Sequence, residues 1–537
     1  MSRGTGSQAP LREVRPATLD VVVIGAGVSG LCIAHHLQRA GFSYRVLEQA
    51  HDLGGTWRDN TYPGCGCDIP APLYSFSFAQ RADWSRLFAS QPEILGYLHD
   101  VAAREGVTQH IDFATAVISA RWQESRQCWT VQTSSGTVLE CRYLVSATGL
   151  LRRPLYPDIV GRSIFAGNAF HSARWDHSVT LQGKRVAVIG SGASAIQFVP
   201  RIAADVKQLT VIQRTPGWIV PKADRTFSPR QQQLRRFAPY RWYTRARLFW
   251  IHEQRVKGFI DPSAPMADAE RLARTMLQRK VADPELRAAL TPDYALGCKR
   301  LLISSDFYPA VTRDNVTVVT SPVAEMTADQ VITADGQSHG ADVVIYATGF
   351  DTQFAFSDIE IVGHDGERLA DRWQQGPSAY LGTTVSGFPN YFVMLGPNSG
   401  LGHNSQIFMI EAQTRYILSC LKTARRRKLG VLVVRPPIER AFNDWLQGRL
   451  VHSVWQAGGC RSWYQHPATG KNTALWPSSA IAFWRKTHRV RLSDYHTRRR
   501  IESPRRSSSA VVDLAGQRAL YANASTGGHE HMRLRSP

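Results

Sequence analysis

Two glycine-rich turns, each between an apolar strand and an apolar-periodic helix, predict an α/β protein with two Rossmann-like dinucleotide-binding domains. The first turn, GAGVSG, follows the apolar run 19–24 and opens the periodic stretch 28–40. The second turn, GSGASA, follows the apolar run 185–189, about 165 residues later. Residues 216–297 are rich in Arg, Gln and Ala and poor in β-branched runs, which predicts a helical insertion.

The glycines of both turns have defined tasks. Gly25 and Gly190 permit the tight strand-to-helix turn, and Gly27 and Gly192 let the backbone approach a pyrophosphate. Gly30 completes the first motif. Free N–H groups and the positive end of the helix dipole then hold the pyrophosphate. Because two such motifs occur in strand–helix–strand context, we expect two bound dinucleotides and a role in electron transfer.

The residues after the second strand of each unit distinguish the two sites. The strand 44–47 ends at Glu48, where a carboxylate accepts hydrogen bonds from ribose hydroxyls and repels a 2′-phosphate, so this site suits FAD or NAD. In the second unit Arg214 and Thr215 follow the strand 209–212, and an arginine there pairs well with phosphate oxygens. The second site is therefore predicted to bind NADPH. The alternative is that Arg214 is a surface arginine of a strongly basic protein.

Two longer strings resemble the signatures of a known family. Residues 165–176, FAGNAFHSARWD, fit F-x-G-x-x-x-H-x-x-x-W-[PD], and residues 54–68, GGTWRDNTYPGCGCD, fit [AG]-G-x-W-x-x-x-x-[FY]-P-[GM]-x-x-x-D. Both signatures belong to the Baeyer–Villiger monooxygenases, which the chain resembles from about residue 17 to about residue 490. The resemblance implies bound FAD, NADPH as reductant and O2 as oxidant. It also implies a flavin C4a-peroxide that inserts one oxygen atom next to the carbonyl of a hydrophobic ketone, giving an ester or lactone.

The resemblance further implies the order of the domains. ATG strings at 147–149 and 347–349 follow apolar strands and resemble the crossings between domains of two-dinucleotide flavoproteins. The expected parts are an FAD-binding domain at 17–150 and 351–496, an NADPH-binding domain at 151–215 and 298–350, the helical insertion at 216–297, and a basic, disordered tail at 497–537.

The resemblance assigns the catalytic chemistry to two residues. Arg300, in the string GCKR, matches the arginine that the family places over the flavin, where a permanent cation favours the deprotonated peroxide. Asp68, the last residue of the longer signature, matches the carboxylate that orients this arginine. Asp68 is therefore also expected beside the cofactor.

Further residues are expected to contact the cofactors. Lys299 matches the family lysine that binds the 2′-phosphate of NADPH together with Arg214 and Thr215, and Trp463 matches a mobile-loop tryptophan that closes over the nicotinamide ribose. The remaining expected contacts are Thr56, Trp57, Tyr74, Val117, Ser194 and Gln197. For the two aromatic residues among them, packing in the core is the alternative.

Other signature positions are less informative about chemistry. His171 and Trp175 are expected to act through domain geometry rather than directly. Residues 58–60, RDN, stand where the best-known ketone-oxidising members carry aromatic residues, and the string after Gly396 reads PNSGLGHNS. The identity of the substrate therefore does not follow from the resemblance.

The eight cysteines show neither metal-ligand spacing nor the framework of a secreted protein. We therefore expect no metal site and reduced thiols. Cys65 and Cys67 could form a redox pair, although disulfide reductases with two dinucleotide sites space theirs by four residues. Residues 1–18 lack an apolar core of signal-peptide length, and no run of eighteen apolar residues occurs. A soluble, cytoplasmic protein is expected.

The net charge of +21 raises the question of an acidic partner. Residues 485–537 hold 12 Lys and Arg against 4 Asp and Glu without a nucleic-acid-binding module, so no nucleic acid is expected. The segment 230–257 mixes arginines with aromatic residues. We expect a helical cover with its rings toward the core and its arginines solvated, and contact with an anionic membrane surface is the alternative. A monomer or small homo-oligomer is expected.

Two other functions stay open. The same flavin chemistry could oxygenate a sulfur or nitrogen atom, which requires the protonated hydroperoxide. Arg300 with Asp68 favours the anion and hence the ketone reaction. A membrane-docked redox partner would use the basic segments but would leave both long signatures unexplained.

Overall fold

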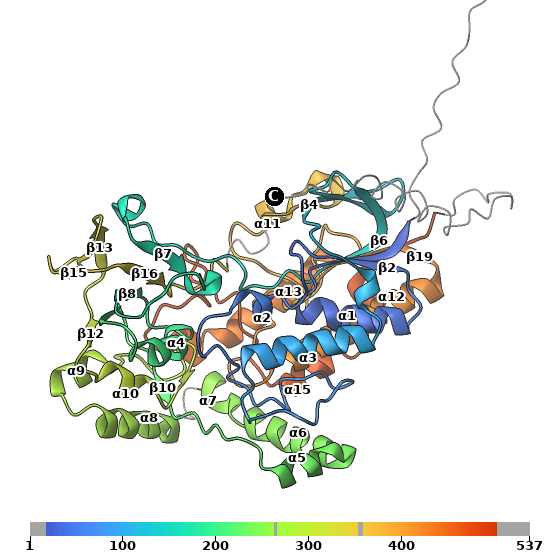
Figure 1. The fold of residues 1–537 in the computed structure, drawn as a ribbon. Helices are drawn as coiled ribbons and strands as arrows, with labels where there is room; N and C mark the ends of the chain where they lie inside the picture. Colours follow the sequence, from blue (N-terminus) through green and yellow to red (C-terminus); the bar gives the residue numbers. More distant parts are fainter. Residues whose placement is uncertain (1–17, 262–265, 353–357, 502–537) are drawn as a thin grey trace, which may run out of the picture. The chain divides into compact units, whose positions relative to one another are not determined.

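Two mainly parallel sheets carry the two glycine turns (Figure 1). The computed structural model describes residues 18–261, 266–352 and 358–501. The described residues up to Arg500 belong to one compact unit. The tail expected at 497–537 begins too early, because Thr497, Arg498 and Arg499 belong to a strand that pairs with residues 429–434. From residue 502 onward the tail lies outside the described residues.

The larger sheet has the strand order β17-β4-β5-β6-β1-β2-β3, with β18 beside β6. The strands next to the first glycine turn are parallel, whereas β5 pairs antiparallel with both β4 and β6. The strands are β1 (Leu19–Ile24), β2 (Tyr44–Leu47), β3 (Ile111–Asp112), β4 (Val117–Gln123), β5 (Cys128–Thr133), β6 (Val138–Ser146), β17 (Glu360–Val362) and β18 (Tyr391–Val393).

Helices cover this sheet because their buried stripes match its apolar strands. Helix α1 (Val28–Arg39) begins at the first glycine turn and packs against α3 (Gln91–Arg104) and α12 (Gln406–Arg427). Helix α12 starts at the capping residue Ser405, whose hydroxyl accepts a hydrogen bond from the backbone N–H of Ile407. The smaller elements of this part are α2 (Thr56–Asp59), α11 (Leu369–Arg372), α13 (Pro436–Leu450), α14 (Val454–Ala457), α15 (Ala480–Lys486), β19 (Leu429–Val434), β20 (Tyr495–Arg499), η1 (Thr108–His110), η4 (His364–Gly366) and η5 (Leu492–Asp494).

The second sheet has the order β12-β9-β8-β16-β7, and all its strands are parallel. A separate three-stranded antiparallel sheet, β13-β14-β15, follows β12 in the chain. The elements are η2 (Arg162–Ile164), β7 (Asn168–His171), η3 (Ser172–Arg174), β8 (Arg185–Ile189), α4 (Ala195–Ile202), β9 (Gln208–Ile212), α10 (Phe307–Val311), β12 (Val316–Val319), β13 (Val323–Met326), β14 (Gln330–Thr333), β15 (Ser338–Gly340) and β16 (Val343–Tyr346).

Between β9 and β11 the chain is mostly helical, as the sequence predicts. These elements are β10 (Ile219–Val220), α5 (Pro229–Arg236), α6 (Ala238–Glu253), α7 (Val256–Ile260), α8 (Ala267–Lys280), α9 (Pro284–Ala289) and β11 (Leu302–Ile303). Helix α5 begins with a capping box between Ser228 and Gln231 and has Pro229 in its first turn. Two Rossmann-like sheets with a helical segment between them confirm the predicted fold class.

The predicted orientation of the segment 230–257 is wrong for most of its rings and for two of its arginines, whereas Arg236 and Arg247 are solvated as expected. Arg235 and Arg245 are buried, while the large aromatic side chains of Phe237, Trp242 and Trp250 are exposed. Neighbouring elements decide which face of a helix is covered. Aromatic and basic residues alternate around α6, so its sequence alone does not mark one face as the core face.

Candidate functional site

Both glycine turns form tight backbone cradles. Gly25 has φ +100°, and a Cβ atom there would lie 2.8 Å from the carbonyl oxygen of Ala147. A Cβ on Gly30 would lie 1.9 Å from the carbonyl oxygen of Gly25. The second turn repeats the geometry, since Gly190 has φ +105° and its Cβ would lie 2.5 Å from the carbonyl oxygen of Ala347. The ATG string at 147–149 therefore lies directly against the first glycine turn, and the string at 347–349 lies against the second.

The helices at the two turns can receive an anion. Neither α1 nor α4 has an acidic residue in its first turn, and no side chain caps their N-termini. Their first N–H groups are thus available to phosphate oxygens. Ser194 is the residue before α4, where the sequence predicts a contact with the second nucleotide. A Cβ on Gly192 would meet no atom within 4 Å, so the chain leaves room beside this turn.

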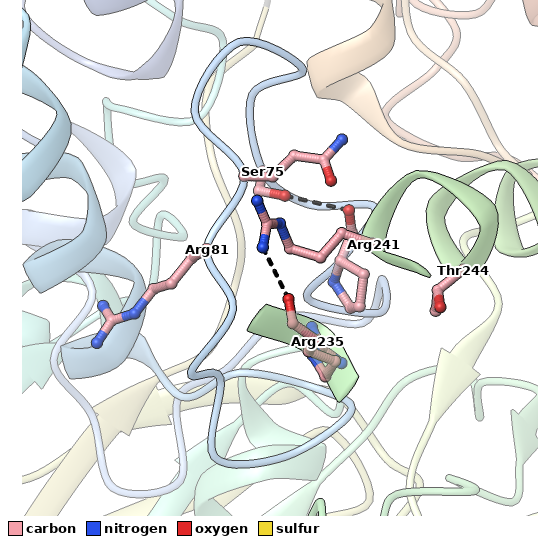
Figure 2. Close-up of a pocket in the computed structure, with 7 residues that line it drawn as sticks. Ser75, Arg81, Arg235, Arg241 and Thr244 are labelled. Carbon is pink, nitrogen blue, oxygen red and sulfur yellow. Dashed lines mark hydrogen bonds between the residues drawn. The ribbon is translucent and has the colours of Figure 1, made fainter. Parts of the chain in front are cut away.

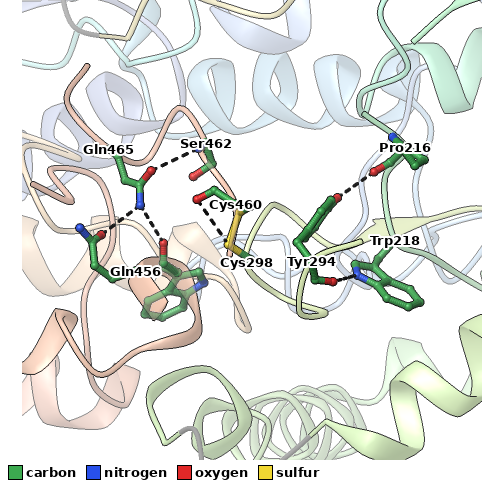
Figure 3. The surroundings of a disulfide bond; sticks show 9 residues. Pro216, Trp218, Tyr294, Cys298, Gln456, Cys460, Ser462 and Gln465 are labelled. Atoms are coloured by element: carbon green, nitrogen blue, oxygen red, sulfur yellow. Dashed lines mark hydrogen bonds between the residues drawn. A yellow bond between two sulfur atoms is a disulfide. The ribbon is translucent and has the colours of Figure 1, made fainter. Parts of the chain in front are cut away.

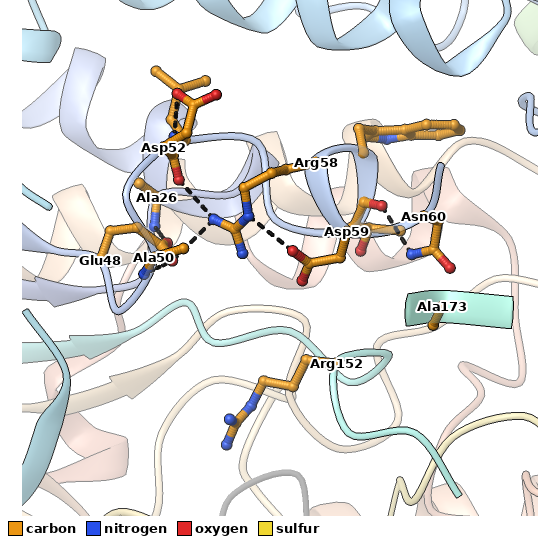
Figure 4. Close-up of polar contacts among 12 residues, drawn as sticks. Ala26, Glu48, Ala50, Asp52, Arg58, Asp59, Asn60, Arg152 and Ala173 are labelled. Atoms are coloured by element: carbon orange, nitrogen blue, oxygen red, sulfur yellow. Dashed lines mark hydrogen bonds and ion pairs between the residues drawn. The ribbon is translucent and has the colours of Figure 1, made fainter. Parts of the chain in front are cut away.

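The carboxylate of Glu48 lies at the end of β2, beside the first turn (Figure 4). Its Oε2 accepts a hydrogen bond from Ala26 N at 2.7 Å, and its Oε1 accepts from Ala50 N at 3.0 Å and from Arg58 Nη1 at 3.0 Å. Burial opposes the charge of Arg58, but Asp59 and Glu48 raise its pKa above the ordinary value. Arg58 therefore holds the predicted ribose-binding carboxylate in place, a role that sequence analysis missed.

Aromatic and apolar residues lie beyond this carboxylate. Trp57 Nε1 donates to the hydroxyl of Tyr74 at 3.1 Å, and the two rings meet edge to face at 5.5 Å. Thr56 opens the short helix α2, and Val117 is buried at the start of β4. Strand β4 adjoins the end of β2, because Thr115 N donates to the carbonyl oxygen of Glu48 at 2.8 Å. The contacts of these residues with FAD remain predictions.

Arg300 and Asp68 form the ion pair that the resemblance predicts. Arg300 Nη2 donates to Asp68 Oδ2 at 3.1 Å; the Asp68 side chain is 9% exposed, and that of Arg300 is 48% exposed. Burial opposes the charge of Arg300, but the negative charge of Asp68 raises its pKa above the ordinary value. Within the described residues the guanidinium makes no second hydrogen bond, so its other N–H groups can receive an anion.

Gln197 fixes the other oxygen of Asp68. Its Nε2 donates to Asp68 Oδ1 at 3.2 Å and to Gly66 O at 3.1 Å, while its Oε1 accepts from Tyr62 OH at 3.0 Å. Gln197 lies on α4 of the second sheet, whereas Asp68 and Tyr62 belong to the longer signature. The predicted contact of Gln197 with a nucleotide remains a prediction, and its observed partners are protein groups that tie the two motifs together.

Arg214 and Lys299 lie near each other at the second turn. Burial, and after it the positive charge of Arg214, lowers the pKa of Lys299. Lys299 Nζ lies 4.8 Å from the ring centre of Tyr294. Arg214 is exposed and Thr215 is partly exposed. The two cations repel each other, and the binding of a phosphate by them remains a prediction.

The expectation that all thiols are reduced is wrong. Cys298 and Cys460 form a disulfide across 162 residues of sequence, with their Cα atoms 6.1 Å apart (Figure 3). Because these cysteines meet only in the folded chain, their spacing in the sequence does not indicate that they form a disulfide. The bond joins the segment before Lys299 and Arg300 to the loop that carries Trp463.

The other cysteines are free and buried. Cys65 and Cys67 are not paired with each other, and burial raises their pKa values to about 11 and about 12. Thiols with raised pKa values are poor nucleophiles at neutral pH, so this pair does not have the properties of a redox couple. In the described ranges no group of three His, Cys, Asp or Glu side chains could hold a metal ion.

The shorter signature packs against helix α4 and against itself. Trp175 contacts the rings of Phe170 and Phe198 at 5.2 and 5.3 Å, and His171 Nδ1 accepts a hydrogen bond from Ala173 N at 3.0 Å. Burial lowers the pKa of His171 to about 4, so its ring is neutral at pH 7. These contacts support a structural role for both residues. Trp463, by contrast, is 40% exposed.

No described helix is both long enough and apolar enough to span a bilayer. Residues 18–370 match the family model "Flavin-binding monooxygenase-like". A Baeyer–Villiger monooxygenase of Pseudomonas aeruginosa is 42% identical over 478 residues, which cover 89% of this chain and 91% of the relative. One of Streptomyces coelicolor is 42% identical over 510 residues, covering 94% of this chain and 98% of the relative.

Solved structures agree with these sequence matches. The OTEMO complex with FAD and NADP has a TM-score of 0.82 at 28% identity and covers 90% of this chain and 100% of its own. A closed cyclohexanone monooxygenase has a TM-score of 0.81 at 29% identity, covering 90% of this chain and 99% of its own. Together with the two glycine cradles and the Arg300–Asp68 pair, these matches show that the chain belongs to the Baeyer–Villiger monooxygenases, a group of FAD- and NADPH-dependent enzymes within the flavin-binding monooxygenase family.

Proposed function

We propose that Arg300, Asp68 and Gln197 form the centre at which this enzyme inserts one oxygen atom next to the carbonyl of a hydrophobic ketone. Bound FAD, reduced by NADPH, supplies the activation of O2. The contribution of the chain is a fixed positive charge where negative charge develops. The observation that carries the proposal is the 3.1 Å contact between Arg300 Nη2 and Asp68 Oδ2, which leaves the other guanidinium N–H groups without a hydrogen bond to any described residue.

The hydrogen bonds indicate a separate role for each of these residues. Asp68 accepts from Arg300 with one oxygen and from Gln197 with the other, so its position and that of the guanidinium are both fixed. A guanidinium stays charged at every working pH, and here its pKa is raised further. Ester formation needs the anionic oxidant, whereas oxygenation of a sulfur atom needs the protonated one. The arrangement therefore favours ketones.

The cofactor contacts are proposed on the same basis. The cradle at Gly25, Gly27 and Gly30, with Glu48, would hold FAD, and Thr56, Trp57, Tyr74 and Val117 would line its surroundings. The cradle at Gly190 and Gly192, with Ser194, would hold the pyrophosphate of NADPH. Arg214, Thr215 and Lys299 would bind the 2′-phosphate, and Trp463 would close over the nicotinamide ribose.

Product analysis tests the proposal. Purified enzyme with NADPH and air is given a panel of cyclic, aryl and long-chain ketones beside a matched panel of sulfides and amines. We expect esters or lactones from ketones to outnumber all heteroatom products. Sulfoxides without any ester would overturn the assignment of Arg300 and favour S-oxygenation.

A further inference from the structure

Helices α5 and α6 present an exposed surface of aromatic, aliphatic and arginine side chains. Between 39% and 65% of the surface of each apolar residue there is accessible, although such large side chains are usually buried in folded proteins. Trp242, Tyr243, Arg247 and Trp250 share one side of α6, because residues three and four apart lie next to each other. The α5–α6 face, as we name it, consists of Leu234, Arg236, Phe237, Trp242, Tyr243, Arg247, Trp250 and Ile251.

The charge of this surface has one sign. Residues 225–257 contain eight arginines and one lysine but only one acidic residue, Glu253. Glu253 is buried and accepts hydrogen bonds from His403 Nε2 at 3.3 Å and Asn404 Nδ2 at 2.9 Å. No carboxylate of α5 or α6 therefore reaches the surface to balance the exposed arginines.

The inner side of α6 is firmly attached to the protein. Arg245, 8% exposed, donates from Nη1 to the carbonyl oxygens of Pro72 at 2.9 Å and Ser75 at 2.7 Å. Its Nη2 lies 3.9 Å from Glu411 Oε2. The exposed rings are thus held outward by a well-anchored helix and are not the result of a loosely packed segment.

A small, shallow hollow adjoins this face (Figure 2). Arg235 and Arg241 line it, and Arg241 Nη1 donates to the carbonyl oxygen of Arg235 at 2.8 Å. Arg81, paired with Asp83 at 2.7 Å, lines the same hollow. Gln80 Nε2 is buried there without a hydrogen-bond partner among the described residues. Such a set of donors suits a phosphate oxygen.

We propose that the α5–α6 face docks on an anionic phospholipid bilayer, with its rings in the headgroup layer and a lipid phosphate at the hollow. Tryptophan and tyrosine favour this layer, and arginines beside them are attracted to anionic lipids. A second copy of the chain fits less well. A two-fold contact would bring two arginine-bearing faces without surface carboxylates together, so like charges would meet. The surface thus matches a lipid partner in both polarity and charge.

Vesicle co-sedimentation tests this proposal with the full chain loaded with FAD. The probes are vesicles of phosphatidylcholine alone and of phosphatidylcholine with phosphatidylglycerol. We expect binding only to the anionic vesicles, with a marked loss when salt rises from 0.05 to 0.5 M, because salt screens exposed charges. Arg236→Gln with Arg247→Gln should lower the partition coefficient about thirtyfold, and Trp242→Ala with Trp250→Ala at least tenfold.

A matched control removes two exposed charges from α8 by Arg279→Gln with Lys280→Gln. Its binding should fall far less than that of the α5–α6 variants, and NADPH oxidation should be unchanged in all of them. Equal binding to both kinds of vesicle, wild-type binding by the α5–α6 variants, or an equal loss in the control would overturn the proposal. So would a change from dimer to monomer in the α5–α6 variants without any change in vesicle binding, since the face would then join two copies.

Discussion

Arg300 and Asp68 lie 232 positions apart in the sequence, yet Arg300 Nη2 is 3.1 Å from Asp68 Oδ2. The second oxygen of Asp68 accepts from Gln197, which lies on a helix of the other sheet. The carboxylate is thus the point at which the string GCKR, the longer signature and the second glycine turn meet. The orientation of the guanidinium therefore depends on how the two sheets are connected.

Removing the charge of Asp68 should weaken oxygenation more than flavin reduction. Asp68→Asn keeps an acceptor for Gln197 but loses a charge-assisted hydrogen bond, so the yield of oxygenated product per NADPH should fall about tenfold or more. The rate of flavin reduction by NADPH should change less. Asp306→Asn, which removes a 2.9 Å surface ion pair with Arg201, is the matched control and should leave the yield intact.

Lys299→Ala or Arg214→Ala should raise the KM for NADPH about tenfold to a hundredfold and spare the KM for NADH. Each variant removes a charge-assisted contact to the 2′-phosphate, which NADH lacks. Lys207→Ala removes a charge just before β9, at its opposite end, and should change neither constant. Steady-state kinetics of each variant with NADPH and with NADH measure the two KM values. Equal use of NADPH and NADH by the wild type would contradict the assignment.

Mild acid should destabilise the protein through His171. Its pKa is about 4 in the folded chain against 6.5 for an ordinary histidine, so the unfolded chain binds the proton more readily. The contribution of His171 to stability is complete above pH 6.5 and is lost as pH falls toward 4. At pH 5 the loss is about 2 kcal/mol.

His171→Asn isolates this contribution, because asparagine can still accept from Ala173 N but does not titrate. Urea unfolding at pH 7.5 and pH 5 should show a smaller loss of stability in the variant than in the wild type. Identical pH dependence in the two proteins would mean that His171 is already protonated or is exposed.

The disulfide should contribute measurably to stability. Cleaving Cys298–Cys460 with dithiothreitol should lower the free energy of unfolding by about 2–4 kcal/mol, because the bond closes a long loop in the unfolded chain. Cys460→Ser should be less stable than the wild type and insensitive to the reductant. Thiol titration of the denatured, unreduced wild type should find the six remaining cysteines. Finding eight thiols would contradict the pairing.

The fold class and the ion pair could be predicted from sequence for different reasons. The strands β1, β2 and β8 are short apolar runs next to glycine turns, and the structure places all three as the sequence predicts. The proximity of Arg300 and Asp68 came only from the family resemblance, since no local pattern links them. The larger part of the cofactor assignments rests on that same resemblance.

Three features could not be predicted because they depend on distant contacts. Cys298 meets Cys460 across 162 residues. Arg58 pairs with Glu48 because the chain between them folds back, and no pattern in the sequence specifies that path. Trp242, Tyr243 and Trp250 of α6 are exposed, and Arg245 holds another side of the helix against the carbonyl oxygens of Pro72 and Ser75. In each case a tertiary neighbour decides the outcome, not local periodicity.

The central claim is that Arg300 supplies the charge for oxygen insertion. It is tested most directly by measuring oxygenated product and hydrogen peroxide formed per NADPH oxidised by Arg300→Ala, with Arg300→Lys beside it. The account predicts that Arg300→Ala binds FAD and is reduced by NADPH, but forms ester about a hundredfold to a thousandfold more slowly and returns the oxygen as hydrogen peroxide. The lysine variant should recover only part of the yield, because an ammonium does not reproduce the planar guanidinium contact with Asp68. A normal ester yield from Arg300→Ala would contradict the account.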